Sequence, residues 1–90
     1  MPLTKRNILR HELIGLEARV VGSSDTTLVG TSGKIVDETR NMLVIEDGKK
    51  SRKISKSNST FLITIPDGEK VSIEGKKLVG RPEERVRRGW

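Results

Sequence analysis

The residues best suited to chemistry in this 90-residue chain are one histidine and two pairs of carboxylates. His11 is the only histidine, and its cationic neighbours favour a surface or packing role over general-base catalysis. Asp37-Glu38 and Glu46-Asp47 stand at facing ends of a predicted hairpin, where clustered carboxylates could hold Mg²⁺. Adjacent strand residues point to opposite faces, however, so each pair offers one carboxylate per face. We interpret the pairs as solvated hairpin ends or salt-bridge partners and predict neither a catalytic nor a metal site.

The composition narrows the class of protein further. The chain has no cysteine, which excludes disulfides and thiolate metal sites. Its longest apolar run falls far short of the roughly 18 residues that a membrane span needs. We therefore expect a cytoplasmic protein that binds no cofactor and no membrane.

Positive charge is concentrated in one segment, DGKKSRKISKS (47–57). Residues 49–64 carry a charge of +5, whereas residues 16–48 carry −3, within a chain of net charge +6. Clustered cations on a folded domain indicate a polyanionic partner. The alternative is a solvated edge strand whose lysines prevent pairing with other chains.

The shortage of aromatic residues indicates which kind of polyanion would fit. Phe61 and Trp90 are the only aromatic residues, so recognition by stacking of unpaired bases is disfavoured. A cationic strand with interleaved serines suits the phosphates and 2′-hydroxyls of a folded RNA. We therefore predict that one side of this strand faces an RNA backbone.

The hydrophobic pattern predicts a small, mainly β domain. From Leu16 onward the apolar residues follow a period of two, with turn residues near every tenth position. This pattern predicts a closed or nearly closed antiparallel barrel in residues 16–79. A helix is predicted over 4–14 within an amino-terminal region (1–15), and another over 82–89 within a carboxy-terminal region (80–90). The predicted strands are 18–23, 28–38, 42–47, 51–57, 60–65 and 70–75.

Three motifs give the chain a family resemblance: LIGL (13–16), GTSGKIVDETRNML (30–43) and RPEER (81–85). Together with the basic strand, they make the sequence resemble the archaeal ribonuclease P protein component 1 family, relatives of the eukaryotic Pop4-type subunit. The resemblance covers the chain from about Ile8 to Gly89. It implies a strongly bent, Sm-like barrel of six or seven antiparallel strands flanked by short terminal helices.

The resemblance also implies a function and partners. Such a subunit supports the RNA of ribonuclease P, an endoribonuclease that removes 5′ leaders from precursor tRNA; catalysis, and the Mg²⁺ that it needs, belong to the RNA. The implied partners are the specificity domain of that RNA, a small zinc-ribbon subunit, the other ribonuclease P proteins and, indirectly, precursor tRNA. The residues expected to contact the protein partner are Ile8, Leu9, Leu13 and Val86. Those expected to contact RNA are Lys5, Arg6, Arg10, Lys34, Arg40, Lys49, Lys50, Arg52, Lys53, Lys56, Arg87 and Arg88.

Two other functions remain open at the level of sequence. A different basic RNA-binding barrel, such as a ribosomal protein, would use the same cationic strand, and GTSGKIV (30–36) resembles a KOW-type strand and turn. A free-standing, metal-dependent nuclease would use the acidic pairs.

Overall fold

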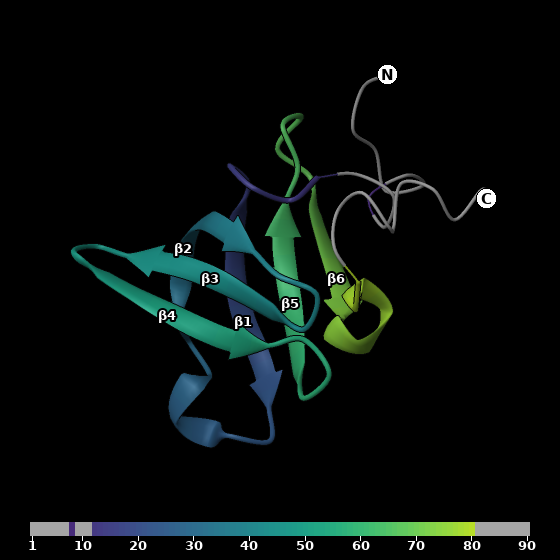
Figure 1. Cartoon of the computed structure of the whole chain (residues 1–90). Helices are drawn as coiled ribbons and strands as arrows, with labels where there is room; N and C mark the ends of the chain where they lie inside the picture. The colour runs from purple at the N-terminus through teal and green to yellow at the C-terminus, as the bar shows by residue number, and fades with distance from the viewer. Residues whose placement is uncertain (1–7, 9–11, 81–90) are drawn as a thin grey trace.

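The computed structural model describes residue 8 and residues 12–80. Six strands within this part of the chain form one antiparallel sheet (Figure 1). All six predicted strands are present, with ends displaced by at most a few residues from the predicted ends. Two short 3-10 turns, η2 (Thr26–Leu28) and η3 (Gly75–Leu78), accompany the strands. The strands are β1 (Glu17–Ser23), β2 (Ser32–Glu38), β3 (Met42–Asp47), β4 (Lys50–Ser55), β5 (Ser59–Thr64) and β6 (Lys70–Glu74).

The mainly β, antiparallel fold is confirmed, but the sheet is open, so the predicted closed or nearly closed barrel is not found among the described residues. The strand order is β4-β3-β2-β1-β5-β6, so β4 and β6 form the two edges and do not pair with each other. Four strands follow one another as antiparallel neighbours, and β5 then returns to pair with β1. In Figure 1, β3 and β4 run across the direction of β5 and β6, so that a single sheet folds around its core.

Two β-bulges interrupt the ladders. The register shifts between Val20 and Gly22 where β1 pairs with β5, and between Ile35 and Asp37 where β2 pairs with β3. A bulge bends its strand and increases the local twist. Both strands that meet at the centre of the sheet are therefore bent, which helps a six-stranded sheet to enclose a small core.

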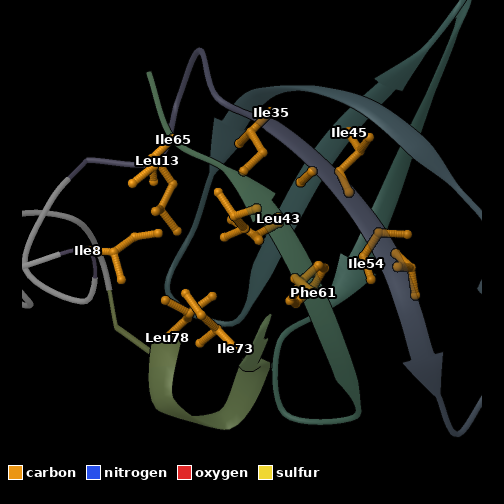
Figure 2. Close-up of a cluster of buried hydrophobic side chains, with 13 residues drawn as sticks. Ile8, Leu13, Ile35, Leu43, Ile45, Ile54, Phe61, Ile65, Ile73 and Leu78 are labelled. Carbon is orange, nitrogen blue, oxygen red and sulfur yellow. The ribbon is translucent and has the colours of Figure 1, made fainter. Parts of the chain in front are cut away.

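The core is aliphatic, as the composition predicts. Phe61 is fully buried on β5, where buried and half-buried residues alternate. Figure 2 shows the cluster gathered between the strands and η3. Its members are Ile8, Leu13, Ala18, Val20, Ile35, Leu43, Ile45, Ile54, Phe61, Ile63, Ile65, Ile73 and Leu78.

The predicted terminal helices fall almost entirely outside the described residues. Of the helix predicted over 4–14, the described residues 12–14 are not helical: residues 12 and 13 carry no regular structure, and a turn follows at Ile14 and Gly15. The strand predicted over 28–38 begins only at Ser32, because Leu28 is the last residue of η2 and a turn follows at residues 29 and 30. Asp25 caps that turn, since its Oδ1 atom accepts hydrogen bonds from the backbone N–H and the hydroxyl of Thr27.

Gly33 offers a direct test of this architecture, because β3 passes too close for any side chain there. A Cβ atom at Gly33 would lie 1.9 Å from the backbone oxygen of Glu46. We predict that Gly33→Ala lowers the free energy of unfolding by about 1–3 kcal/mol, the usual range for overpacking. Urea denaturation measures this change.

Gly22→Ala is the matched control, since Gly22 also lies in a strand but its new Cβ would meet Thr60 at an ordinary 3.6 Å. We expect Gly22→Ala to change the unfolding free energy by no more than about 0.5 kcal/mol. Equal effects of the two substitutions would contradict the close approach of β3 to Gly33.

Candidate nucleic-acid interface

The strongest concentration of exposed cations lies on the hairpin formed by β3 and β4. Gly48 and Lys49 form the turn between Asp47 and Lys50, and Gly48 adopts the positive φ of 64° that such a tight turn requires. The buried residues of this hairpin end at Ile45 and Ile54, and the residues beyond them are exposed. We call residues 46–53, which project from the body of the sheet in Figure 1, the cationic arm. Its cations are Lys49, Lys50, Arg52 and Lys53, all of them exposed.

The cations of the arm lie around the edge of the sheet rather than on one of its faces. Arg52 pairs with Ile45 and so shares the core side of the hairpin, whereas Lys53 pairs with the half-buried Val44 on the outer side. The cations therefore lie on both sides of the strand, and the contact of one side with RNA stays a prediction. Because β4 pairs only with β3, its other edge is open, and a polyanion approaching that edge could reach both sides.

The charge of the arm is only partly balanced by its own carboxylates. Asp47 lies opposite Lys50, and Glu46 lies opposite Ser51, so four cations face two carboxylates and residues 46–53 carry a net charge of +2. Within the described part of the chain, none of the four cations takes part in a salt bridge. The arm therefore keeps its charges available at the surface.

Lys34 and Arg40 lie apart from the arm. On the outer face of the sheet, Lys34 stands between Glu46 of β3 and Glu17 of β1, which are its register partners on either side. A phosphate near Lys34 would therefore approach two carboxylates as well. Arg40 is exposed on the turn between β2 and β3, and its backbone oxygen accepts a hydrogen bond from the N–H of Gly80. RNA contact by these two residues stays a prediction.

The position of Lys56 does not fit its predicted contact with RNA, because its side chain is fully buried. Its ammonium donates to Glu38 Oε2 at 2.7 Å and to the backbone oxygens of Thr39, Arg40 and Gly80 at 2.7, 3.3 and 2.8 Å. The carboxylate of Glu38 is buried as well, so the two form an ion pair shielded from water. An ammonium enclosed in this way cannot reach a phosphate. We call this arrangement the Lys56 clasp.

The period of two contains the signal that would have revealed the clasp. Lys56 lies two residues after Ile54 and thus on the core side of the chain, where a cation must find partners. Glu38 pairs with Leu43, and Leu43 pairs with Ile54, so the carboxylate falls on the same side. The total positive charge of residues 49–56 does not distinguish Lys56, on the core side, from the exposed cations of β4.

The acidic residues of the described chain were also expected to lie at hairpin ends or in salt bridges. No group of three or more potential metal ligands occurs among residue 8 and residues 12–80. The two acidic pairs lie at opposite ends of the β2–β3 hairpin, not at facing ends, because the register places Glu46 against Lys34 and Asp37 near the turn. Glu38 belongs to the clasp, and the Asp37 carboxylate accepts a hydrogen bond from the backbone N–H of Glu38. The interpretation of Glu38 as a salt-bridge partner is therefore confirmed.

Two of the residues predicted to bind a protein partner are buried instead. Ile8 and Leu13 are 2% and 0% exposed and belong to the core (Figure 2), so they stabilise this domain and are not available at its surface. The remaining predicted site residues lie outside the described part of the chain. They are Leu9 and Val86 for the protein partner, and Lys5, Arg6, Arg10, Arg87 and Arg88 for RNA. No helix among the described residues is both long and apolar enough to cross a bilayer.

The fold and the charge distribution thus define a small antiparallel β domain with a projecting cationic hairpin. Comparison with known proteins gives the family. The family described as ribonuclease P/MRP, subunit p29, matches residues 6–88, so the chain belongs to this family of ribonuclease P protein subunits.

Individual relatives agree with this assignment. Ribonuclease P protein component 1 of Methanosphaera stadtmanae is 45% identical over 96% of this chain and 92% of its own length. The protein of the same name from Pyrococcus abyssi is 52% identical over 98% of this chain and 68% of its own length. A solved structure described as Mth11, a homologue of human RNase P protein Rpp29, superposes with a TM-score of 0.61 at 45% identity. It covers 84% of this chain and 99% of its own. The chain is thus a protein component of ribonuclease P, whereas its kinship to the eukaryotic Pop4-type subunit stays a prediction.

The clasp predicts that two lysines three residues apart on the chain contribute very differently to stability. We expect Lys56→Met to lower the free energy of unfolding by about 3–5 kcal/mol, because it leaves the Glu38 carboxylate buried without its ammonium partner. Lys53→Met, at an exposed position, should change it by less than about 0.5 kcal/mol. Urea denaturation at neutral pH compares the two variants.

The double variant Glu38→Met/Lys56→Met separates charge burial from packing. Removing both charges should recover much of the stability lost in Lys56→Met, since no uncompensated charge remains. If Lys56→Met were as stable as Lys53→Met, the ion pair would not be buried as described.

Proposed function

We propose that this chain binds the RNA of ribonuclease P through the cationic arm and so supports RNA-catalysed removal of 5′ leaders from precursor tRNA. The observation that carries the proposal is the placement of Lys49, Lys50, Arg52 and Lys53 on a hairpin that extends beyond the core. Residues in that position add nothing to the buried core, so a folding role does not account for their charge.

The chemistry of the arm favours the RNA backbone over exposed bases. Lysine and arginine head groups pair with phosphate oxygens, and arginine can do so with two parallel hydrogen bonds. Ser51 lies between the cations of β4 and is itself exposed, so its hydroxyl can add a hydrogen bond without bulk. No aromatic side chain lies in residues 42–57 to stack on a base. Recognition would therefore depend on the shape and charge of a folded RNA.

The arm is also pre-organised for such a role. The arm is the outer part of the β3–β4 hairpin, in which six register pairs, from Met42–Ser55 to Asp47–Lys50, hold the two strands together. The cations are thereby fixed on a β-hairpin and not on a free loop, which reduces the entropy lost on binding. The open edge of β4 leaves room for a strand of RNA to lie along it.

The identity of the protein partner remains a narrower proposal. We expect a small zinc-ribbon subunit to bind, and because Ile8 and Leu13 are buried, Leu9 and Val86 are the candidates that remain. Contact with the specificity domain of the RNA and a requirement of that RNA for Mg²⁺ are further expectations from the family resemblance. A cytoplasmic location is an expectation from the composition alone.

The RNA proposal predicts a specific loss of salt dependence. We expect Lys53→Met to weaken binding to ribonuclease P RNA and to reduce the slope of log K against log salt concentration by roughly 0.7–0.9, the value for one phosphate contact. Arg52→Met should have a similar effect. Filter binding at several salt concentrations measures both affinity and slope.

Lys70→Met is the matched control, because Lys70 is an exposed lysine at the start of β6, the opposite edge strand. It should leave both affinity and slope unchanged. If Lys70→Met and Lys53→Met weakened binding equally, the RNA would be responding to net charge and not to the arm.

A further inference from the structure

The sheet consists of two halves that meet along one ladder. Strands β2, β3 and β4 form the half that carries the arm, and β1, β5 and β6 form the other. The two halves join where β1 pairs with β2, a ladder of three residue pairs that backbone hydrogen bonds extend at both ends. The bulge between Ile35 and Asp37 lies in the arm-bearing half, close to this junction. On the opposite side, between β4 and β6, no strand pairing joins the halves.

The Lys56 clasp spans this open side. Lys56 follows β4, and Glu38, Thr39 and Arg40 surround the turn between β2 and β3, so all four residues lie at the base of the arm. Gly80 follows η3, which contacts β5 and β6 of the other half. Its oxygen accepts from the Lys56 ammonium at 2.8 Å, and its N–H donates to the Arg40 oxygen at 2.7 Å. Two hydrogen bonds therefore tie the base of the arm to the segment that follows η3.

Close backbone packing reinforces the same connection. A Cβ atom on Gly75, the first residue of η3, would lie 2.0 Å from the Lys56 oxygen and 2.6 Å from the Ser59 oxygen. Only a residue without a side chain allows the loop after β4 to approach η3 so closely. A third link is the hydrogen bond from the Ser24 N–H to the Asn58 oxygen, at 3.0 Å.

We propose that Lys56 is a positioning residue for RNA binding: it fixes the angle between the cationic arm and the rest of the sheet and does not itself contact RNA. This inference rests on the proposed function of the arm. Without the clasp, the β2–β3–β4 half would lose the hydrogen bond from Lys56 to Gly80. The β1–β2 ladder and the short connection from β4 to β5 would then hold it less firmly, and the arm could change its angle. The arm would then spend part of its time in orientations that cannot bind. Apparent affinity falls in proportion to the fraction of molecules that are competent to bind.

The first experiment measures the angle of the arm in the free, full-length protein. Because the chain has no cysteine, Lys49→Cys and Lys77→Cys introduce unique sites for two spin labels, one on the arm and one on η3. With the clasp intact, double electron–electron resonance should give one narrow distance distribution. In the Glu38→Met/Lys56→Met background, the distribution should broaden to at least twice that width.

A second variant keeps this test independent of whether the double variant folds well. Gly75→Ala leaves both charges of the clasp in place but forces the loop after β4 away from η3. It should also broaden the distribution. An unchanged width in the folded fraction of both variants would overturn the positioning role, whatever the protein does with RNA.

The second experiment uses ribonuclease P RNA and compares Lys56 with Lys53 in unlabelled protein, below the unfolding temperature of each variant. Glu38→Met/Lys56→Met should bind about three- to tenfold more weakly, as expected if the competent fraction falls to between a third and a tenth. Its salt slope should match that of the unaltered protein, because every cation of the arm is retained. Lys53→Met should lower the slope instead.

Two outcomes would overturn the inference in different ways. A reduction of the slope in the Lys56 variant equal to that in Lys53→Met would mean that Lys56 contacts phosphate directly. Unchanged RNA affinity in both variants, together with a broadened distance distribution, would refute the RNA function of the arm while showing that the clasp still sets its angle.

Discussion

A buried ammonium group is the constraint on which this small domain depends. Removing a lysine head group from water carries a penalty of several kcal/mol, and only well-placed acceptors can offset it. Lys56 has a carboxylate and three backbone oxygens within hydrogen-bond distance. Those oxygens belong to Thr39, Arg40 and Gly80, which lie outside the strands and have no place in a ladder. The ammonium therefore pairs with these oxygens at the side of the sheet where β4 and β6 do not pair. It connects the two halves of the open sheet there.

Neighbouring lysines of one strand region thus have different physical roles. Lys53 is exposed on an edge strand and adds nothing to the core, whereas Lys56, three residues later, is enclosed and joins two parts of the sheet. The first suits contact with a polyanion, and the second sets the geometry in which that contact occurs. In a chain that belongs to a family of ribonuclease P protein subunits, we propose that the two roles act together: one lysine presents charge to the RNA, and the other holds that charge at a defined angle.

Local sequence patterns were enough to predict much of the fold. Alternation of apolar residues located all six strands, and the turn residues between them separated β3 from β4, the hairpin on which the arm is built. Closure of the sheet could not be predicted in this way, because it depends on whether β4 and β6 come close enough to pair, and no local pattern encodes that distance. The same limit affected Ile8 and Leu13, whose apolar character fits a partner interface as well as a core. The predicted RNA contact of Lys56 was wrong for another reason. The net charge of a segment does not show on which side of the strand each cation lies.

The central claim is that the arm, and not the opposite edge of the sheet, faces the RNA. Hydroxyl-radical cleavage of ribonuclease P RNA from an iron chelate tethered to a single cysteine tests it most directly, since the chain has no cysteine of its own. A chelate at Lys49→Cys should cut the RNA at a few defined positions in the assembled complex, and one at Lys70→Cys should leave those positions uncut. Cleavage of the same positions from Lys70→Cys, with none from Lys49→Cys, would contradict the account.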